Sequence, residues 1–245
     1  PRINAAGRLE KASDSVRLLI AERKEHAEKL ASSINDLNVR RREFDNKITE
    51  EALSMIQQNE KLLNAKSTVI FNENWHKGVI GIVASRLTDT YYRPTIVLTR
   101  SNNLITGSAR SIKNFDIYDA IDNCSDLLEH FGGHKYAAGL SLKPENLEEF
   151  SRRFEEYVAN NIDKEELIPE LNVDLEIDFS DITPKFVRVL KQFAPFGPGN
   201  MAPVFLSKNV IDNGLSRSVG NKKHLKLTIC QQQDPSLIFA GIAFQ

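Results

Sequence analysis

The segment from residue 9 to residue 65 constrains the fold more than any other, because it contains no proline and no glycine. Apolar residues step along it by three, four or seven positions, which is the stripe of an amphipathic helix. The stripe consists of Ala27, Leu30, Ile34, Leu37, Phe44, Ile48 and Met55. One unbroken helix here would be on the order of 75 Å long at 1.5 Å per residue. Such a helix predicts a bridge between two domains or a coiled coil.

Two alternatives stay open for this segment. The polar run "SSINDLN" at residues 32–38 could break the helix, and a helical hairpin packed on the rest of the chain would show the same stripe. Ser13 or Asp14 is the expected N-cap, because a short polar side chain there can accept a hydrogen bond from a free amide of the first turn.

The part from residue 66 to residue 165 alternates predicted strands and helices. Strands are expected over "STVIF", "PTIVLT", "NLITGSARS" and "AAGLSLK", and helices over "KGVIGIVASRLTDTYY", "IYDAIDNCSDLLEHF" and "NLEEFSRRFEEYVANNI". Helices and strands of this length that alternate predict an α/β layer, with the helices packed on a sheet.

The part from residue 166 to residue 245 predicts a small β domain. "ELNVDLEIDFSDI" alternates strictly and indicates a half-buried strand, and "TPKFVRVLKQF" is a short helix with Pro184 in its first turn. The turn-forming loop "APFGPGNMAPVF" and several short strands follow. One helix among short strands favours a small open barrel or sandwich.

Composition limits the functions that the chain can have. The net charge is −1, so a nucleic-acid partner has to meet a local basic patch. Cys124 and Cys230 lie far apart without metal-ligand spacing, which indicates a reducing compartment and argues against a zinc ribbon. No apolar run is long enough to cross a membrane, so we expect a cytoplasmic protein. The chain begins at Pro1 and lacks a starting Met, and we expect a fragment or a processed product.

The stretch "FGGHKYAAG" exposes more backbone than a core element needs. Gly132 is expected to be the left-handed cap of a helix ending at Phe131, and Gly133 to leave the next amide open to a ligand. His134 can then donate a hydrogen bond to a phosphate or sugar oxygen. A glycine pair after a helix is more often a cap with no further role.

Two further motifs place donors near one another. Ser108 and Arg110 are two positions apart on a predicted strand, so they share a face and form a plausible phosphate clamp. Trp75 and His76 precede a helix whose first amides would point outward, and an exposed Trp could stack on a base. The alternatives are a surface Arg on an exposed strand and a packed Trp at a domain edge.

Taken in order, these motifs resemble the bacterial RecJ single-stranded-DNA exonucleases of the DHH phosphoesterase superfamily. The resemblance rests on "PRINAAGRL", "NWHKGVIGIVASRL", "RPTIVL", "GSARSI", "FGGHKYAAGLSL", "FAPFGPGN" and "HLKL". It implies the end of a catalytic domain and a long connecting helix over residues 1–65, a DHH-associated α/β domain over 66–165, and a partial OB-like barrel over 166–245.

The resemblance also implies site residues. Ser108 and Arg110 would hold a phosphate, plausibly the 5′ end, with Arg2 and Arg8 contributing from the domain junction. Gly132, Gly133 and His134 would contact the nucleic-acid backbone. In the barrel, the basic run Arg217, Lys222, Lys223, His224 and Lys226 would track the strand; its alternative is a charged edge that prevents strand pairing.

The chain departs from the family pattern in one respect, because no Asp-His-His run occurs in it. Two-metal hydrolysis needs several carboxylates that converge on the ions. We therefore expect no catalytic or metal-binding residue in this chain, with Mn²⁺ or Mg²⁺ bound elsewhere in a full-length enzyme. This chain alone should bind but not cut.

The predicted function is the substrate-binding portion of a single-stranded-DNA-specific 5′-3′ exonuclease in DNA repair and recombination. Single-stranded DNA is the expected partner, together with a single-strand-binding protein or a helicase. Three alternatives stay open: a phosphodiesterase of the same superfamily that acts on short oligonucleotides or cyclic dinucleotides, a non-catalytic nucleic-acid-binding module, and a coiled-coil scaffold.

Overall fold

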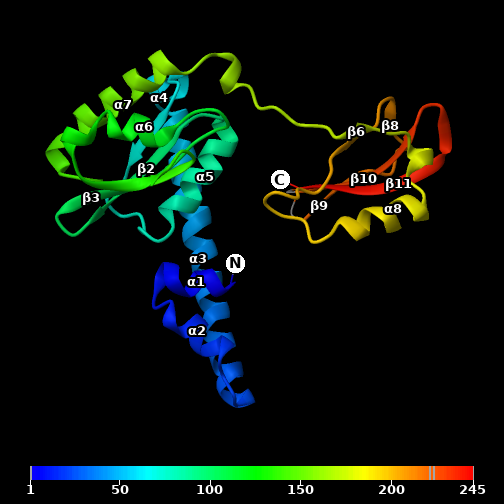
Figure 1. Cartoon of the computed structure of the whole chain (residues 1–245), viewed down its shortest axis with the longest axis horizontal. Coiled ribbons are helices and arrows are strands. Elements are labelled where there is room, and N and C mark those ends of the chain that lie inside the picture. The colour runs from blue at the N-terminus through cyan, green and yellow to red at the C-terminus, as the bar shows by residue number, and fades with distance from the viewer. Residues whose placement is uncertain (1, 221, 223, 245) are drawn as a thin grey trace. The chain divides into compact units, whose positions relative to one another are not determined.

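The computed structural model describes residues 2–220, 222 and 224–244, and the chain forms two compact units (Figure 1). Unit 1 is Pro1–Pro169 and unit 2 is Glu170–Gln245. In the described part of the chain, no helix is both long and apolar enough to cross a lipid bilayer.

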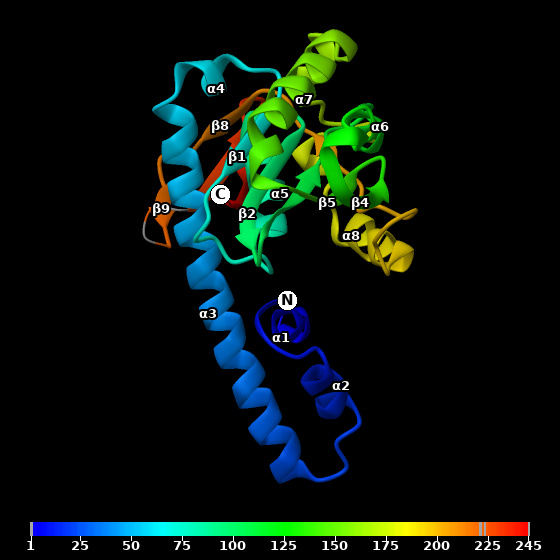
Figure 2. The ribbon, with the colours of Figure 1, turned by 90° about the vertical axis from the view of Figure 1, so that its left-hand side faces the viewer.

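Residues 2–65 form four α-helices, so the prediction of one unbroken helix over residues 9–65 was wrong. They are α1 (Arg2–Leu9), α2 (Ser13–Leu19), α3 (Lys24–Gln57) and α4 (Glu60–Asn64). Figure 2 shows α1 and α2 beside the first half of α3, where Ile34 and Leu37 pack against Ala6. This packing explains why "SSINDLN" does not break α3. The N-cap of α2 is Ala12, with no side-chain hydrogen bond, so neither Ser13 nor Asp14 is the predicted cap.

Unit 1 continues as a five-stranded sheet in the order β1-β2-β3-β5-β4. The strands are β1 (Thr68–Phe71), β2 (Thr95–Ser101), β3 (Leu104–Arg110), β4 (Leu128–His134) and β5 (Ala137–Leu142). β1 runs parallel to β2 and α5 (Ile80–Tyr91) connects them; the other pairs are antiparallel. The predicted α/β layer is therefore present.

Helices cover the two faces of this sheet differently (Figure 1). On one face, α6 (Ile117–Asp122) and α7 (Leu147–Asn161) bury a core that includes Leu98, Leu140 and Phe150. On the other face, α5 and the second half of α3 pack on Ile70 and Val97. α5 packs mainly on β2 and β3, so it covers this part of the sheet.

The helix predicted over residues 117–131 was wrong beyond Asp122. A 3₁₀ turn at Ser125–Leu127 follows α6, and Leu128–His134 is the edge strand β4. β4 pairs antiparallel with β5, and Phe131 packs on the core beneath it. Pairing and burial outweigh the local helical pattern here. Gly132 consequently lies within a strand and is not a helix cap.

A buried ion cluster and a buried indole fix α5 against α3. The Asp45 carboxylate on α3 is fully buried and accepts from Arg41 at 3.2 Å and from Arg86 of α5 at 3.0 Å. Trp75, in the turn before α5, donates from Nε1 to Glu51 of α3 at 2.8 Å. The start of α5 is therefore held rigidly in place.

The described residues of unit 2 form one α-helix and two small sheets. α8 (Pro184–Leu190) starts with Pro184 in its first turn, as predicted, and Thr183 caps it. β6 (Leu175–Glu176) pairs parallel with β7 (Phe205–Leu206). An open four-stranded sheet contains β8 (Val210–Asp212), β9 (Arg217–Val219), β10 (His224–Gln231) and β11 (Asp234–Phe244). This open sheet agrees with the partial-barrel prediction.

The half-buried strand predicted near residue 175 was largely wrong. Leu171 and Leu175 are exposed, and of the alternating apolar residues only Ile177 is buried. The regular strand is only two residues long because its partner β7 is equally short. Alternation alone could not reveal that the partner ends so soon.

A candidate phosphate clamp and nucleic-acid interface

Ser108 and Arg110 lie on the face of β3 that meets the first turn of α5. Their neighbour Ala109 points to the opposite face, where it is buried in the core under α6 and α7. The prediction that Ser108 and Arg110 share a strand face is confirmed.

Gly81, in the first turn of α5, brings the two side chains together. A Cβ atom built on Gly81 would lie 3.0 Å from Ser108 Oγ and 3.1 Å from Arg110 Nη2. Arg110 uses Nη1 to donate to the Ala109 carbonyl at 2.7 Å, which leaves Nη2 available. Among the described residues, neither the Gly81 amide nor the Ser108 hydroxyl donates a hydrogen bond. We call Gly81, Ser108 and Arg110 the phosphate clamp.

The charge at the clamp is positive and not neutralised. No carboxylate among the described residues forms an ion pair with Arg110. Burial, and then the like charge of Arg8, lower the pKa of Arg110, which nevertheless stays protonated at neutral pH. An anion between these groups would relieve both the repulsion and the lack of hydrogen-bond partners.

Arg8 reaches this region from α1. Its Nη1 donates to the Gly78 carbonyl at 3.2 Å. A Cβ atom on Gly78 would lie only 1.9 Å from the Arg8 carbonyl oxygen, so only glycine permits this approach of α1 to the turn before α5. Arg8 therefore stands near Arg110 because two backbone segments touch. Arg2, on the same helix, instead lines a hollow of about 540 Å³ beside Arg41 and Arg42.

A shelf made of two glycines, an alanine and a histidine extends from the clamp across the sheet. Ser108 is opposite Gly139 on β5, and Gly139 is opposite Gly132 on β4. In the next row Arg110 is opposite Ala137, and Ala137 is opposite His134. Directly opposed residues of antiparallel strands share a face. We call Gly132, His134, Ala137 and Gly139 the shelf.

The two glycines of "GGH", Gly132 and Gly133, play different structural roles. A Cβ atom on Gly132 would meet nothing within 4 Å, so Gly132 leaves the shelf backbone open. Gly133 has a φ of +155°, and a Cβ atom there would lie 2.3 Å from the Ala137 carbonyl oxygen. Gly133 is therefore needed for the strand pairing itself. His134 is exposed, and its Nδ1 accepts from the Tyr136 amide at 3.3 Å.

Trp75 and His76 do not take the role that the sequence suggested. Trp75 is only 4% exposed, so it cannot stack on a base; the alternative of a packed Trp is correct. His76 Nδ1 accepts from the Gly78 amide at 3.0 Å, and its ring stacks on Phe44 with 5.5 Å between centroids. Burial, and then the charges of Lys77 and Arg40, lower the pKa of His76. Both residues shape the turn that presents Gly81.

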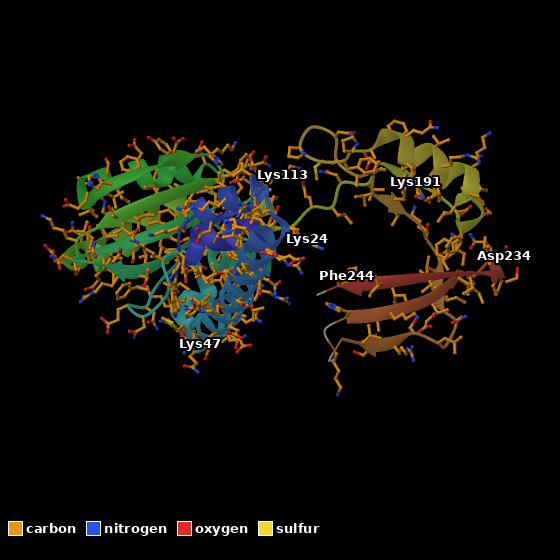
Figure 3. The ribbon with its side chains drawn as sticks, turned by 90° about the horizontal axis from the view of Figure 1, so that it is seen from below. Lys24, Lys47, Lys113, Lys191, Asp234 and Phe244 are labelled. Carbon is orange, nitrogen blue, oxygen red and sulfur yellow. The ribbon has the colours of Figure 1, made fainter. Side chains whose placement is uncertain are left out.

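In unit 2 the strand register places three basic residues on one face. Arg217 of β9 is opposite Lys226 of β10, which is opposite Ile242 of β11. His224 is opposite Phe244, and the two rings meet edge to face at 5.2 Å. We call Arg217, His224 and Lys226 the basic face; Phe244 ends the strand beside it (Figure 3).

The rest of the predicted basic run lies in the turn between β9 and β10. Lys222 is exposed there, with a φ of +67°. Lys223 lies outside the described residues. Within residues 2–220, 222 and 224–244, no three His, Cys, Asp or Glu residues come close enough to hold a metal ion.

Comparison with known families covers most of the chain. A model of the DHHA1 domain matches residues 43–160, and a model of the RecJ OB domain matches residues 173–245. The chain belongs to the RecJ family. The two matched segments agree with the two units, since the DHHA1 match lies in unit 1 and the OB match lies in unit 2.

Relatives in this family are named single-stranded-DNA-specific exonuclease RecJ. The Bacillus subtilis protein is 39% identical over 94% of this chain and 29% of its own length. The Haemophilus influenzae protein is 33% identical over the whole chain and 43% of its own length. The chain thus spans well under half of the length of these relatives.

Solved RecJ structures share the fold. The RecJ of Thermus thermophilus in complex with Mn²⁺ aligns with a TM-score of 0.80 at 29% identity, over 98% of this chain and 37% of that one. The same protein in complex with Mg²⁺ gives 0.78 at 28% identity, over 100% of this chain and 41% of that one. The Mn²⁺ and Mg²⁺ ions are bound by the Thermus thermophilus protein.

Sequence reasoning expected free amides at the start of this helix, around Lys77 to Gly81. It did not identify Gly81 as the place where Ser108 and Arg110 meet α5, or Gly78 as the place where α1 meets the turn before α5. A signal was present in "KGVIGIVASRL", where two glycines fall at the start of an otherwise apolar, β-branched helix. Such glycines weaken a helix, so they indicate a close approach by another group.

Proposed function

We propose that this chain is the substrate-binding portion of a single-stranded-DNA-specific 5′-3′ exonuclease that acts in DNA repair and recombination. The observation that carries the proposal is that the Ser108 hydroxyl and Arg110 Nη2 meet at the bare Cα of Gly81, in the first turn of α5. A hydroxyl and an unneutralised guanidinium beside a helix N-terminus form a site for a phosphate group.

Each surface has a separate task in this proposal. The clamp holds a terminal phosphate, because a phosphate monoester carries nearly two negative charges and Arg8 and Arg110 supply two positive ones. The shelf accommodates the adjoining sugar-phosphate backbone, since its small side chains leave the strand surface low. The basic face in unit 2 contacts phosphates further along the strand by charge, while Phe244 offers a ring for stacking.

Hydrolysis in the full-length enzyme would require a divalent-ion site. Within the described residues, no three His, Cys, Asp or Glu side chains come close enough to form one, so we infer that residues elsewhere in the enzyme hold its Mn²⁺ or Mg²⁺. The match to the RecJ OB domain supports a long strand as the substrate over a short oligonucleotide or cyclic dinucleotide. Single-strand-binding protein or helicase partners and a cytoplasmic location stay predictions.

The replacement Arg110→Ala tests the proposal. Removal of a charge-assisted contact costs about 1.5–3 kcal/mol, so the affinity for 5′-phosphorylated single-stranded DNA should fall about tenfold or more. Affinity for the same strand with a 5′-hydroxyl should change little. Both dissociation constants are measured by fluorescence anisotropy at fixed salt.

Arg152→Ala is the matched control. Arg152 is an exposed arginine on α7, paired with Glu149 and Glu156, on the face of the sheet away from the clamp. If wild-type protein binds both strands equally, or if Arg152→Ala and Arg110→Ala behave alike, the clamp does not recognise a terminal phosphate.

A further inference from the structure

Gly81 is a poor choice for the helix that contains it. It is the second residue of α5, between Ile80 and Ile82. Glycine is less favourable than alanine inside a helix because it loses more backbone freedom on folding. The backbone of Gly81 does not require glycine either, since its φ lies outside the positive range. The fold of α5 therefore gives no reason for this residue.

The surroundings of Gly81 do give a reason. The atoms nearest to a Cβ at this position are Ser108 Oγ, Arg110 Nη2 and Ser108 Cβ, all of them atoms of the clamp residues. Gly107 contrasts with it: a Cβ there would lie 2.4 Å from Leu98 Cδ2 and 3.3 Å from Leu140 Cδ2, inside the hydrophobic core. Gly107 is required by packing, and Gly81 borders only the two residues that would bind phosphate.

A methyl group on Gly81 would act on the clamp in two ways. Contacts of 3.0 and 3.1 Å are shorter than ordinary van der Waals contacts, so Ser108 and Arg110 would each move outward by a few tenths of an ångström. The same methyl group would occupy the space beside Ser108 Oγ and Arg110 Nη2 that an oxygen of a bound phosphate would need.

We infer that Gly81 is a specificity-determining residue for the terminal phosphate. Its bare Cα lets Ser108 and Arg110 close onto the first turn of α5. This inference rests on the proposed function, because it names the group that gives the clamp its selectivity. Replacement of Gly81 by alanine should then weaken phosphate binding without lowering stability, which replacement of a merely structural residue would not do.

The test compares Gly81→Ala with Ala84→Gly in the full 245-residue chain. Ala84 is buried one turn further along the same helix and does not belong to the clamp. The probes are one single-stranded oligonucleotide with a 5′-phosphate and the same oligonucleotide with a 5′-hydroxyl. For each variant, the ratio of the two dissociation constants and the melting temperature are measured.

We expect Gly81→Ala to lower the preference for the 5′-phosphate about tenfold, as one lost charge-assisted contact would. Its melting temperature should stay unchanged or rise by about 2 °C, because alanine favours the helix. Ala84→Gly should show the reverse, with a lower melting temperature and an unchanged preference.

Two results would overturn the inference. One is that Gly81→Ala keeps the preference for the 5′-phosphate strand while Arg110→Ala loses it. The clamp would then work without Gly81. The other is a Gly81→Ala protein that melts below Ala84→Gly or fails to fold, which would make Gly81 a packing residue like Gly107. A wild-type chain that shows no preference for the 5′-phosphate at all would instead reject the proposed function.

Discussion

The clamp in unit 1 and the basic face in unit 2 both gather positive charge, but they hold it in different ways. Arg110 is partly buried, bonded to a backbone carbonyl and pressed against α5. Arg217 and Lys226 stand exposed on a three-residue strand and its neighbour. A fixed guanidinium selects one geometry, whereas mobile side chains follow many. In the proposed function, the clamp therefore suits the end of a DNA strand, and the basic face suits single-stranded DNA of any sequence.

The packing beneath each surface explains this difference. In unit 1, a buried core lies on each face of the sheet, and α5 is anchored by Asp45 and Trp75. Among the described residues of unit 2, the buried apolar side chains are Ile177, Phe179 and Cys230. Rigid support lets donors converge before a ligand arrives, which lowers the entropic cost of binding.

The largest effect is expected when the support of the clamp is removed. Trp75→Ala deletes a buried indole and its hydrogen bond to Glu51, and loss of such a side chain costs about 3–5 kcal/mol. Urea unfolding should show unit 1 destabilised by this amount, with unit 2 unaffected. Tyr136→Ala, which removes an exposed ring from the same unit, is the control. Equal stability of the two variants would mean that Trp75 does not anchor the site.

A smaller effect should separate the two surfaces by their salt dependence. Replacing Arg217 and Lys226 together by Ala removes two phosphate contacts, so the slope of log affinity against log salt should fall by about 1.4. The preference for a 5′-phosphate should not change, because the clamp is untouched. Lys191→Ala provides a control, since Lys191 is an exposed lysine beside α8 (Figure 3). An unaltered slope would show that the basic face does not follow the strand.

The smallest effect concerns pH and unit 1 alone. Because the pKa of His76 is lowered on folding, the unfolded chain takes up its proton first as the pH falls below about 6.5. The free energy of unfolding should therefore decrease on acidification below that pH and level off below the folded pKa. His76→Asn should reduce this decrease, and exposed His26→Asn should not. Identical pH profiles for both variants would remove His76 from this account.

The sequence alone determined the elements whose signal is local. Pro184 and the residues after it specify a short helix, and the alternation of Ser108 and Arg110 about Ala109 specifies their common face. The motif order also identified the family, and the absence of an Asp-His-His run set the expectation about metal. These features depend on neighbouring residues or on their order, both of which are written in the chain.

Only the tertiary structure decided which residues meet. Residues 128–131 end a predicted helix, yet they belong to β4 because β5 offers backbone partners and a core for Phe131. The sequence around Trp75 leaves both an exposed and a packed ring open, and Glu51 on a distant helix holds the ring in the core. Gly81 becomes part of the clamp only when β3 lies against α5. Contacts between residues far apart in sequence decide these cases, and no local pattern records them.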